Sequence, residues 1–492
     1  MAEFAVTATD LIALLPVWIL AAGALLLLML EVYIKSNWPR AEMAAAFLAL
    51  ALGSTLYVSH YYYEGAGLFN GILMADPFTL FFTELILAGS LLSVLLSTGG
   101  LKSERIESLG EYYCLLLCAS LGAILFAAAG ELITMFLSLE IMSMALYCLC
   151  GSAISLRCST ESALKYFLLG SFSSAFLLYG IAIIYGVSGS TEIVEINSYV
   201  ATMKPSAMLY VGMAFLLIGF AFKISAVPFH FWAPDVYQGA PTSVTAYMAC
   251  VVKAAAVAAL LRGMWSMFRE PETFMAWSYA VWLMAVLTMS LGNLAALRQR
   301  SLKRMLAYSS IAHVGYVLVA VLAPEQGGGA AILFYLVSYT VMTLGAFGVV
   351  MAVTRRYAAL PDSDDISRFR GLGFSRPLLG VLMALFMFSL AGLPPGMAGM
   401  FGKFYLFNAA VQADYIGIVI IGVLNSAISC AYYLRVLVVM YFEEGDERVE
   451  PQGIHFGFSM ASALGICAFL TLGLGVFAAE LHAVTSWAAS GM

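Results

Sequence analysis

Four lysines and one glutamate lie inside long apolar stretches of the chain, where charged side chains are rare. They are Lys165, Lys223, Lys253, Lys403 and Glu140. A charge at the centre of a bilayer costs about 2.5–3.5 kcal/mol on insertion scales, so such residues usually face the interior of a helix bundle and mark a path for ions or protons. The pattern predicts a chain that moves protons across a membrane.

Lysine suits this task because burial disfavours its charged form and can bring it into the range where it exchanges protons near neutral pH. Glu140 is the expected counter-charge of Lys223. At a separation of about 7 Å and an effective dielectric constant of about 20, their attraction is roughly 2.4 kcal/mol. Moving or neutralising the carboxylate would favour release of the lysine's proton. The same pair could also be a static salt bridge that only holds the fold together.

Other residues extend this set. Three alanines follow Lys253 and leave space beside it for a helix or water. His230 and His313 add imidazole groups, which titrate near neutral pH. Serine and tyrosine surround His313, so the pattern fits a relay step as well as a packed core histidine. Lys165, near the end of its apolar stretch, could instead extend to the membrane surface.

The composition indicates one broad class of protein. Of the 492 residues, 62% are hydrophobic and 11% are charged, and the mean hydropathy is +0.94. Soluble domains have about 45–50% apolar and about 25% charged residues, so we predict an all-α polytopic membrane protein. The net charge of −6 includes no basic patch for nucleic acid. The apolar run 11–33 is interpreted as a first span rather than a cleaved signal.

Eight cysteines lie in or beside the predicted spans, and none forms a C-x-x-C pair. Packed, reduced thiols are therefore expected rather than disulfides or zinc or iron–sulfur ligands. The sequence has no glycine-rich nucleotide loop after a strand and no His/Cys cluster with metal spacing. We expect no cofactor in this chain, and any coupled redox chemistry in other proteins.

A membrane span requires about 20 apolar residues, and the sequence contains 14 candidate stretches. Their approximate limits are 11–33, 41–59, 77–97, 112–129, 131–153, 161–186, 206–227, 242–262, 275–297, 302–322, 327–354, 376–411, 414–442 and 457–480. Span 7 runs into Pro228 and Pro234, and span 12 is interrupted at Pro394 and Pro395. Proline removes a backbone donor and clashes with the preceding turn, so both helices should break there.

Each break lies beside a lysine, because Lys223 precedes the first and Lys403 follows the second. Interrupted helices at corresponding places in two halves indicate a transport site built from inverted repeats. The predicted units are 1–110 with helices 1–3, 111–265 and 266–445 with five helices each, and 446–492 with helix 14. The alternative is that both breaks are ordinary proline kinks.

The distribution of Lys and Arg predicts the orientation in the membrane. Loops after odd-numbered spans, with the adjacent helix ends, hold 16 of these residues, whereas loops after even-numbered spans hold only Lys204, Arg262 and Arg269. The first set of loops is therefore predicted to be cytoplasmic. Both termini would then lie on the opposite, periplasmic side.

The longest loops carry no hypothesis about chemistry. Residues 60–76 and 187–205 fall outside and could form short strands or a hairpin. Residues 355–375 fall inside and contain an acidic cluster followed by two arginines, which is typical of a solvated helix or loop. Glu31 and Glu84 are carboxylates in apolar segments with no clear partner, for which structural roles are favoured.

Three segments carry a family resemblance. They are FKISAVPFHFWAPDVYQGAPTSVTA at 222–246, YSSIAH at 308–313 and AGLPPGMAGMFGKFY at 391–405. Together they resemble the antiporter-like membrane subunits of bacterial NADH:quinone oxidoreductase, respiratory complex I, and the likeness covers nearly the whole chain. Lysine at position 403 resembles subunit N and the antiporter relatives, whereas the sister subunit M has glutamate there. No long C-terminal amphipathic extension, as in subunit L, is present.

The resemblance implies a 14-helix fold with two inverted five-helix repeats and discontinuous helices 7 and 12. It also implies roles for the ionisable residues of helices 5, 7, 8, 10 and 12, which are here Glu140, Lys223, Lys253, His313 and Lys403. Lys303 could match a further helix-10 lysine, although Arg300 and Arg304 beside it equally fit a positive-inside role. The implied function is a proton-translocating module that works with other membrane subunits of the complex, where FMN, iron–sulfur clusters and quinone are expected.

We therefore expect protons to enter from the cytoplasm near Lys165 and Lys223. They would pass Lys253 and His313 through buried water and leave outward from Lys403, across a bacterial inner membrane. Energy from quinone reduction in neighbouring subunits would be transmitted through the helix-5 glutamate. One alternative is a subunit of an Mrp-type cation/proton antiporter, which would exchange sodium without NADH or quinone. Another is a scaffold subunit that conducts nothing.

Overall fold

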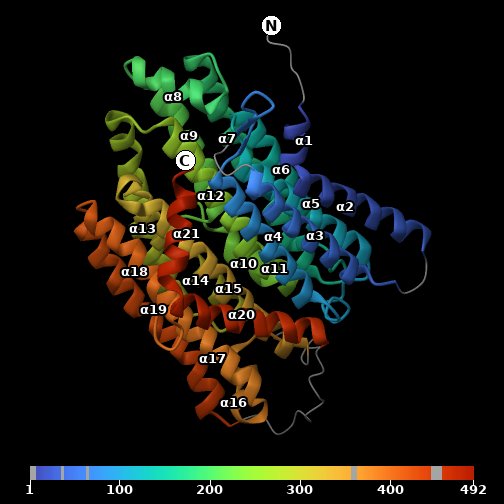
Figure 1. Ribbon diagram of the computed structural model, residues 1–492. Coiled ribbons are helices and arrows are strands. Elements are labelled where there is room, and N and C mark those ends of the chain that lie inside the picture. Colours follow the sequence, from blue (N-terminus) through green and yellow to red (C-terminus); the bar gives the residue numbers. More distant parts are fainter. Residues whose placement is uncertain (1–6, 35–37, 62–65, 356–362, 445–456, 492) are drawn as a thin grey trace.

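The computed structural model describes residues 7–34, 38–61, 66–355, 363–444 and 457–491. Almost every described segment is helical, and the long helices pack side by side in one bundle (Figure 1). Within the described residues the one sheet is an antiparallel hairpin of β1 (Ala66–Leu68) and β2 (Leu73–Ala75). The all-α fold predicted from the composition is confirmed.

Thirteen described helical segments are long and apolar enough to cross a membrane. They are α2 (Leu15–Tyr33), α3 (Arg40–Tyr61), α4 (Pro77–Ser97), α5 (Leu109–Ala128), α6 (Leu132–Cys150), α7 (Arg157–Ser188), α9 (Ala207–Ile224), the run of α11 (Thr242–Tyr247), η1 (Met248–Val252) and α12 (Lys253–Met267), α13 (Pro271–Ala296), α14 (Leu302–Val321), the run of η2 (Pro324–Gly328) and α15 (Gly329–Thr354), α19 (Ile416–Phe442) and α20 (Phe458–Val476). The remaining predicted span, 376–411, consists of two shorter helices, α17 (Pro377–Ala391) and α18 (Met397–Gln412). This arrangement agrees with the 14 spans expected from hydropathy.

Spans 7 and 12 break where proline and glycine predict it. After α9, Ser225 adopts a left-handed conformation with φ of 64°, and the chain resumes as α10 (Trp232–Gly239). After α17, Gly392 has φ of 83° and α18 begins at Met397. The freed backbone groups find side-chain partners, since Val227 N donates to Thr288 Oγ1 at 2.9 Å. Such replacement bonds allow a broken helix at membrane depth.

Two of the helices that carry candidate residues, α9 and α14, start at side-chain caps. Ser206 accepts a hydrogen bond from Leu209 N at 3.2 Å before α9, and Ser301 accepts one from Arg304 N at 3.1 Å before α14. A serine in this position satisfies one of the amide groups that a helix start leaves free. Before α12, the wider helical turn η1 displaces the register just ahead of Lys253; such turns often accompany functional sites.

Several short elements complete the described chain, and they decide what the two outer loops form. They are α1 (Ala8–Ala13), α8 (Ile193–Thr202), η4 (Ile366–Phe369), α16 (Leu372–Ser375) and α21 (Ala478–Ala489). The hairpin expected within 60–76 is confirmed by β1 and β2, but 187–205 contains the helix α8 rather than strands, because Ile193, Ile196 and Val200 bury one apolar helical face. The last span ends at Val476, and α21 turns back to pack against α15.

Burial separates central from peripheral helices. In an apolar stretch of 18 residues within each span, 100%, 94% and 89% of the residues are buried for α11–α12, η2–α15 and α14, against 33% for α2, α19 and α20. The helices that carry Lys253 and His313 are thus enclosed by protein, whereas the peripheral helices expose apolar side chains as a membrane requires. Elements α1 and α8 lie toward one end of the bundle and α16 toward the other (Figure 1).

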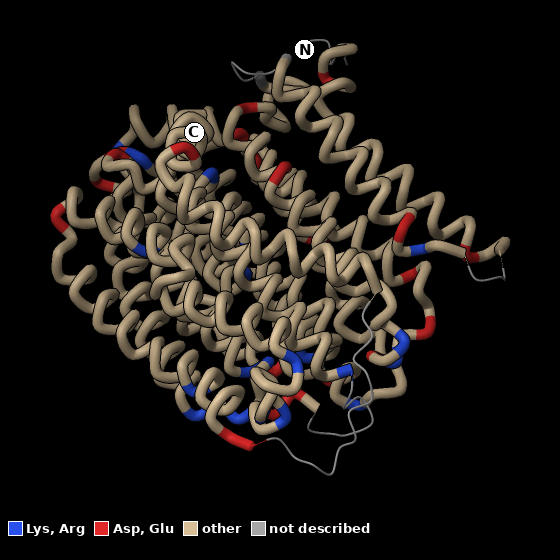
Figure 2. The backbone as a smooth tube through the Cα atoms, turned by 60° about the horizontal axis from the view of Figure 1, so that its bottom comes forward, with Lys and Arg blue, Asp and Glu red and all other residues tan. Residues whose placement is uncertain are grey.

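Positive residues concentrate at the end of the bundle that holds α16 (Figure 2). Parts of two loops considered above, 62–65 and 356–362, lie outside the described residues, as do 1–6, 35–37, 445–456 and 492. Arg262, which the sequence analysis assigned to an outward loop, is a buried residue of α12 and is 5% exposed. That assignment was wrong because the helix continues past this arginine.

Candidate functional site

Three lysine side chains are buried in the interior of the bundle. Lys223, Lys253 and Lys403 are 6%, 4% and 5% exposed. Lys223 lies in the last turn of α9 beside the first break, Lys253 opens α12 after the wide turn, and Lys403 lies in α18 beyond the second break. The backbone is irregular near each lysine, and at the second break it leaves the Ala391 carbonyl free to accept from Lys403.

Hydroxyl groups hold Lys223. Its Nζ donates to Ser143 Oγ at 2.8 Å and to Tyr166 OH at 3.0 Å, and it also lies 5.3 Å from the centre of the Tyr166 ring. Tyr166 stacks on Trp232 of α10, with ring centres 4.6 Å apart. Helix α10, which follows the break, therefore holds Tyr166 in place against Lys223, which precedes the break.

Glu140 lies one turn before Ser143 on α6 and makes no ion pair with Lys223 within 4 Å. Its Oε1 is buried and has no hydrogen-bond partner among the described residues. The arrangement is a separated pair rather than a closed salt bridge, so the distance between the two groups can change without breaking a direct bond.

Lys253 connects α12 to α14. Its Nζ donates to the Ser310 carbonyl oxygen at 3.0 Å and makes a very short contact with the Ser310 hydroxyl. One serine of α14 thus holds the central lysine through two of its oxygen atoms.

His313, which is 2% exposed, lies one turn further along α14. Its Nδ1 is hydrogen-bonded to the Tyr335 hydroxyl, and its Nε2 lies 2.9 Å from the Tyr433 hydroxyl. The same Tyr433 hydroxyl is hydrogen-bonded to Ser309. Both ring nitrogens are therefore occupied by hydroxyl groups that can donate or accept, which is the geometry a relay requires.

Lys403 is held by backbone and side chain at the second break. Its Nζ donates to the Ala391 carbonyl at 2.9 Å and to Ser426 Oγ at 3.0 Å, and it lies 5.2 Å from the centre of the Tyr316 ring. A Cβ atom at Gly392 would lie 3.2 Å from the lysine Cδ. Glycine is needed there for its positive φ and for this close approach.

A buried asparagine connects the surroundings of His313 and Lys403. Asn293 of α13 is fully buried; its Nδ2 donates to Tyr316 OH at 3.0 Å, and its Oδ1 accepts from Tyr432 OH at 3.0 Å. Tyr316 faces Lys403, and Tyr432 lies against Tyr433, with ring centres 4.4 Å apart. Polar groups therefore continue from the histidine to the last lysine.

Two predicted site residues lie apart from this row. The Lys165 side chain is 42% exposed and pairs with Glu161 and Asp235 at 2.9 Å each, so it lies at the surface, as one of the two sequence interpretations held. His230 is half-buried beside Phe231, with ring centres 4.6 Å apart. No hydrogen bond joins His230 to the three buried lysines or to His313 within the described part of the chain.

Several polar residues of the site were missed by sequence reasoning. The most important are Ser143, Tyr166, Asn293, Ser310, Tyr335 and Tyr433. The sequence could not single out these residues, because serine and tyrosine are common in membrane spans. Only the packing of the helices shows which of them contact a buried lysine or His313. Lys303 was left between two roles; it is 7% exposed and donates to the Ala240 carbonyl at 2.7 Å.

Arg262 and Asp76 form a second buried feature, separate from the lysine row; each is 5% exposed. Arg262 donates from Nη1 and Nη2 to the two Asp76 oxygens at 2.8 and 2.9 Å, and to the Ala127 carbonyl from Nε at 3.1 Å. Asp76 also caps α4 through Thr79 N at 2.7 Å. This closed ion pair joins α4, α5 and α12, and its role is structural.

The fold and the buried row define a polytopic membrane protein of the kind that carries ions or protons through the bilayer. A family model described as NADH:quinone oxidoreductase/Mrp antiporter, TM, matches residues 129–429. Relatives of known name identify the family within this class. A protein of Trichlorobacter lovleyi, NADH-quinone oxidoreductase subunit N, is 44% identical over 90% of this chain and 89% of its own. Subunit N 1 of Sorangium cellulosum is 41% identical over 95% and 96%. The chain belongs to the NADH-quinone oxidoreductase subunit N family.

Solved structures agree with this placement. A chain of respiratory complex I from Thermus thermophilus with bound aureothin has a TM-score of 0.78 and 34% identity, covering 95% of this chain and 99% of that one. A chain of the Mrp complex from Dietzia has a TM-score of 0.82 at 20% identity, covering 98% and 97%. At 20% identity, the similarity to the Mrp chain shows a shared fold alone.

Proposed function

We propose that this chain is a proton-translocating membrane subunit of NADH:quinone oxidoreductase. Protons would move through buried lysine, histidine, hydroxyl groups and water, driven by quinone reduction in other subunits. The site residues are Glu140, Lys223, Lys253, His313 and Lys403, with Lys165 at the cytoplasmic surface. His230 is kept as a candidate at the first break.

The observation that carries this proposal is the contact of each buried ammonium or imidazole with hydroxyl groups. Lys223 bonds Ser143 and Tyr166, and His313 lies between two tyrosine hydroxyls. An ammonium that keeps hydroxyl partners can give up a proton without leaving a buried charge unpaired, since a hydroxyl donates to the resulting amine. A static carboxylate salt bridge would instead hold the proton in place.

The direction of transfer follows from the topology we propose. Residues 111–265 and 266–445 would form inverted five-helix repeats, flanked by 1–110 and 446–492, and the breaks in spans 7 and 12 occupy the fourth helix of each repeat. Basic loops would face the cytoplasm and both termini the periplasm of a bacterial inner membrane. Protons would then enter beside Lys165 and Lys223 and leave outward from Lys403.

Other membrane subunits of the complex, chiefly antiporter-like and small ones, are the expected partners. FMN, iron–sulfur clusters and quinone would be bound outside this chain. The described residues contain no group of three or more His, Cys, Asp or Glu arranged to hold a metal ion. The Mrp-type alternative is less favoured, because the relatives named above are subunits of NADH-quinone oxidoreductase at 41–44% identity.

Replacement of one buried lysine tests the proposal. In inverted membrane vesicles, Lys223→Met should abolish NADH-driven proton translocation while the chain still inserts and the complex assembles. Lys102→Met, at an exposed lysine in a loop, is the matched control and should pump normally. Normal pumping by Lys223→Met would remove Lys223 from the mechanism. Sodium-dependent exchange without NADH would instead favour the antiporter alternative.

A further inference from the structure

Three hydroxyl groups from three different helices meet in the core. Ser90 of α4 and Ser120 of α5 are hydrogen-bonded to each other at 2.9 Å, and Ser120 is also hydrogen-bonded to the Tyr247 hydroxyl of α11 at 3.0 Å. Both serines are fully buried, and Tyr247 is 1% exposed. These three residues form the hydroxyl cluster. A buried polar cluster whose members all have partners holds its helices in one arrangement.

The hydroxyl cluster lies directly before the wide turn that precedes the central lysine. Tyr247 is the last residue of α11, η1 (Met248–Val252) follows it, and Lys253 is the first residue after that turn. A turn of this kind holds one residue more than an α-helical turn, so it rotates every later side chain by about 100° around the helix axis. The direction of the Lys253 side chain therefore depends on whether the wide turn forms.

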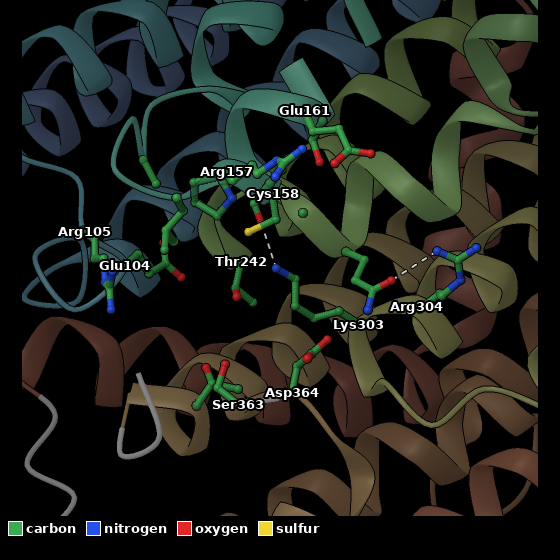
Figure 3. Close-up of a pocket in the computed structure, with 18 of the residues that line it drawn as sticks. Glu104, Arg105, Arg157, Cys158, Glu161, Thr242, Lys303, Arg304, Ser363 and Asp364 are labelled. Atoms are coloured by element: carbon green, nitrogen blue, oxygen red, sulfur yellow. Dashed lines mark hydrogen bonds between the residues drawn. The ribbon is translucent and has the colours of Figure 1, made fainter. Parts of the chain in front are cut away.

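Helix α11 is short, and its two ends have different surroundings. It has six residues, and the first of them, Thr242, lines a cavity of about 670 Å³ at the end of the bundle that holds the basic loops (Figure 3). A side chain beside a cavity lacks packing partners on that side. The hydroxyl cluster holds the opposite, inner end of α11, where the wide turn begins.

The wide turn is also packed closely between α4 and α15. Gly89 precedes Ser90 on α4, and a Cβ atom at Gly89 would come within 2.8 Å of Val251 Cγ2. The glycine thus allows the α4 backbone to approach η1. Cys250 Sγ donates to the Thr340 carbonyl of α15 at 3.7 Å. Since Cys250 and Val251 both belong to η1, neighbouring helices contact the turn along its length.

The direction of Lys253 matters because one residue supplies its hydrogen-bond acceptors. Its Nζ contacts the carbonyl oxygen and the hydroxyl of Ser310, and the lysine is 4% exposed. A charge that is buried without hydrogen-bond partners is costly. A change in the wide turn would rotate the ammonium away from Ser310 and so remove the contact that joins α12 to α14.

We infer that Tyr247 is a positioning residue: through Ser120 and Ser90 it fixes the wide turn, which in turn directs Lys253 at Ser310. The inference rests on the proposed function, in which Lys253 carries protons. It also gives α4 a part in proton transfer, although α4 lies outside the two proposed repeats.

Tyr247→Phe tests the inference because it removes the hydroxyl and keeps the ring. In inverted vesicles that contain the assembled complex, NADH-driven proton translocation should fall about fivefold. In a density map of the variant complex, Lys253 Nζ should no longer lie within hydrogen-bond distance of Ser310. Normal translocation would overturn the inference, and so would reduced translocation with the contact between Lys253 and Ser310 unchanged.

Two serines of α4 provide a matched pair that leaves Tyr247 in place. Ser90 and Ser93 are both buried, and each donates to the carbonyl four residues earlier, but only Ser90 is hydrogen-bonded to Ser120. Ser90→Ala should lower translocation several-fold, whereas Ser93→Ala should pump normally. Equal rates for the two variants would contradict the inference, even if Tyr247→Phe does not assemble.

A double variant separates positioning from a general effect on stability. If Tyr247 acts through the contact of Lys253 with Ser310, Tyr247→Phe/Ser310→Ala should translocate protons about tenfold more slowly than the unmodified chain, as Ser310→Ala alone does. Two independent effects would multiply to about fiftyfold. A fiftyfold loss would show that the hydroxyl cluster acts apart from Lys253.

A parallel measurement on Lys253→Met distinguishes failure of this inference from failure of the proposed function. If Lys253→Met pumps normally, the proposed function itself fails. If Lys253→Met stops pumping while Tyr247→Phe and Ser90→Ala pump normally, the role of Lys253 stands and the role of the hydroxyl cluster is wrong.

Discussion

Lys253 and Ser310 are hydrogen-bonded across the centre of the bundle, through both the carbonyl oxygen and the hydroxyl of the serine. The first residue opens α12 and the second lies on α14, so the contact joins the two proposed repeats. A lysine that bonds across this junction can respond to changes in either half. The contact therefore links the helix of the central lysine to the helix that carries His313.

Removing the Ser310 hydroxyl should slow proton transfer without stopping it. Ser310→Ala leaves Lys253 with the carbonyl acceptor only, and a hydrogen bond to a charged group contributes about 1.5–3 kcal/mol. We expect proton translocation to fall about tenfold. Ser310→Thr keeps a hydroxyl and is the control. Equal rates for the alanine and threonine variants would show that the hydroxyl is dispensable.

Tyr433→Phe should interrupt the link between Ser309 and His313, because one hydroxyl serves both residues. NADH-driven proton translocation in vesicles should fall several-fold while assembly is retained, since the ring still fills its site. Tyr441→Phe changes a tyrosine of the same helix outside the buried row and should have no effect. A loss of assembly rather than of pumping would indicate a packing role for the Tyr433 hydroxyl.

Gly392→Ala should weaken the second break. Its positive φ is unfavourable for alanine by about 1 kcal/mol, and the new Cβ would press on Lys403 at 3.2 Å. We expect reduced pumping with normal insertion. Gly465→Ala adds a methyl group where nothing lies within 4 Å, and it should behave as the unmodified chain. Wild-type pumping by Gly392→Ala would show that Lys403 tolerates displacement.

Arg262→Met should destabilise the chain strongly, because it leaves the buried Asp76 carboxylate without its partner. Breaking a buried pair costs about 3–5 kcal/mol, and we expect a lower level of the subunit in membranes and a lower thermal midpoint of the solubilised complex. Arg269→Met, at an exposed arginine nearby, should change neither quantity.

The double variant Arg262→Met/Asp76→Asn supplies the second control for this pair. Asparagine removes the unpaired charge and keeps the cap on α4, so most of the lost stability should return. If the double variant is as unstable as Arg262→Met, the cost lies in packing around the arginine rather than in charge.

The spans and the two breaks could be predicted from the sequence because both depend on local properties. Apolar length decides which segments cross a membrane, and proline and glycine interrupt a helix wherever they occur. For the loop 187–205, short strands or a hairpin were considered, but it contains α8. Its apolar residues at 193, 196 and 200 follow helical spacing over too short a stretch to stand out in the sequence.

The sequence by itself determined that lysines lie in apolar spans beside broken helices, because residue type and hydropathy are local properties of the chain. Only the tertiary structure decided which lysines are buried. It placed Lys165 at the surface and Lys303 in the interior, and it closed Arg262 onto Asp76. It also selected Ser143, Ser310 and Tyr433 as partners. These outcomes depend on how helices distant in sequence rotate and pack against one another, which local patterns do not encode.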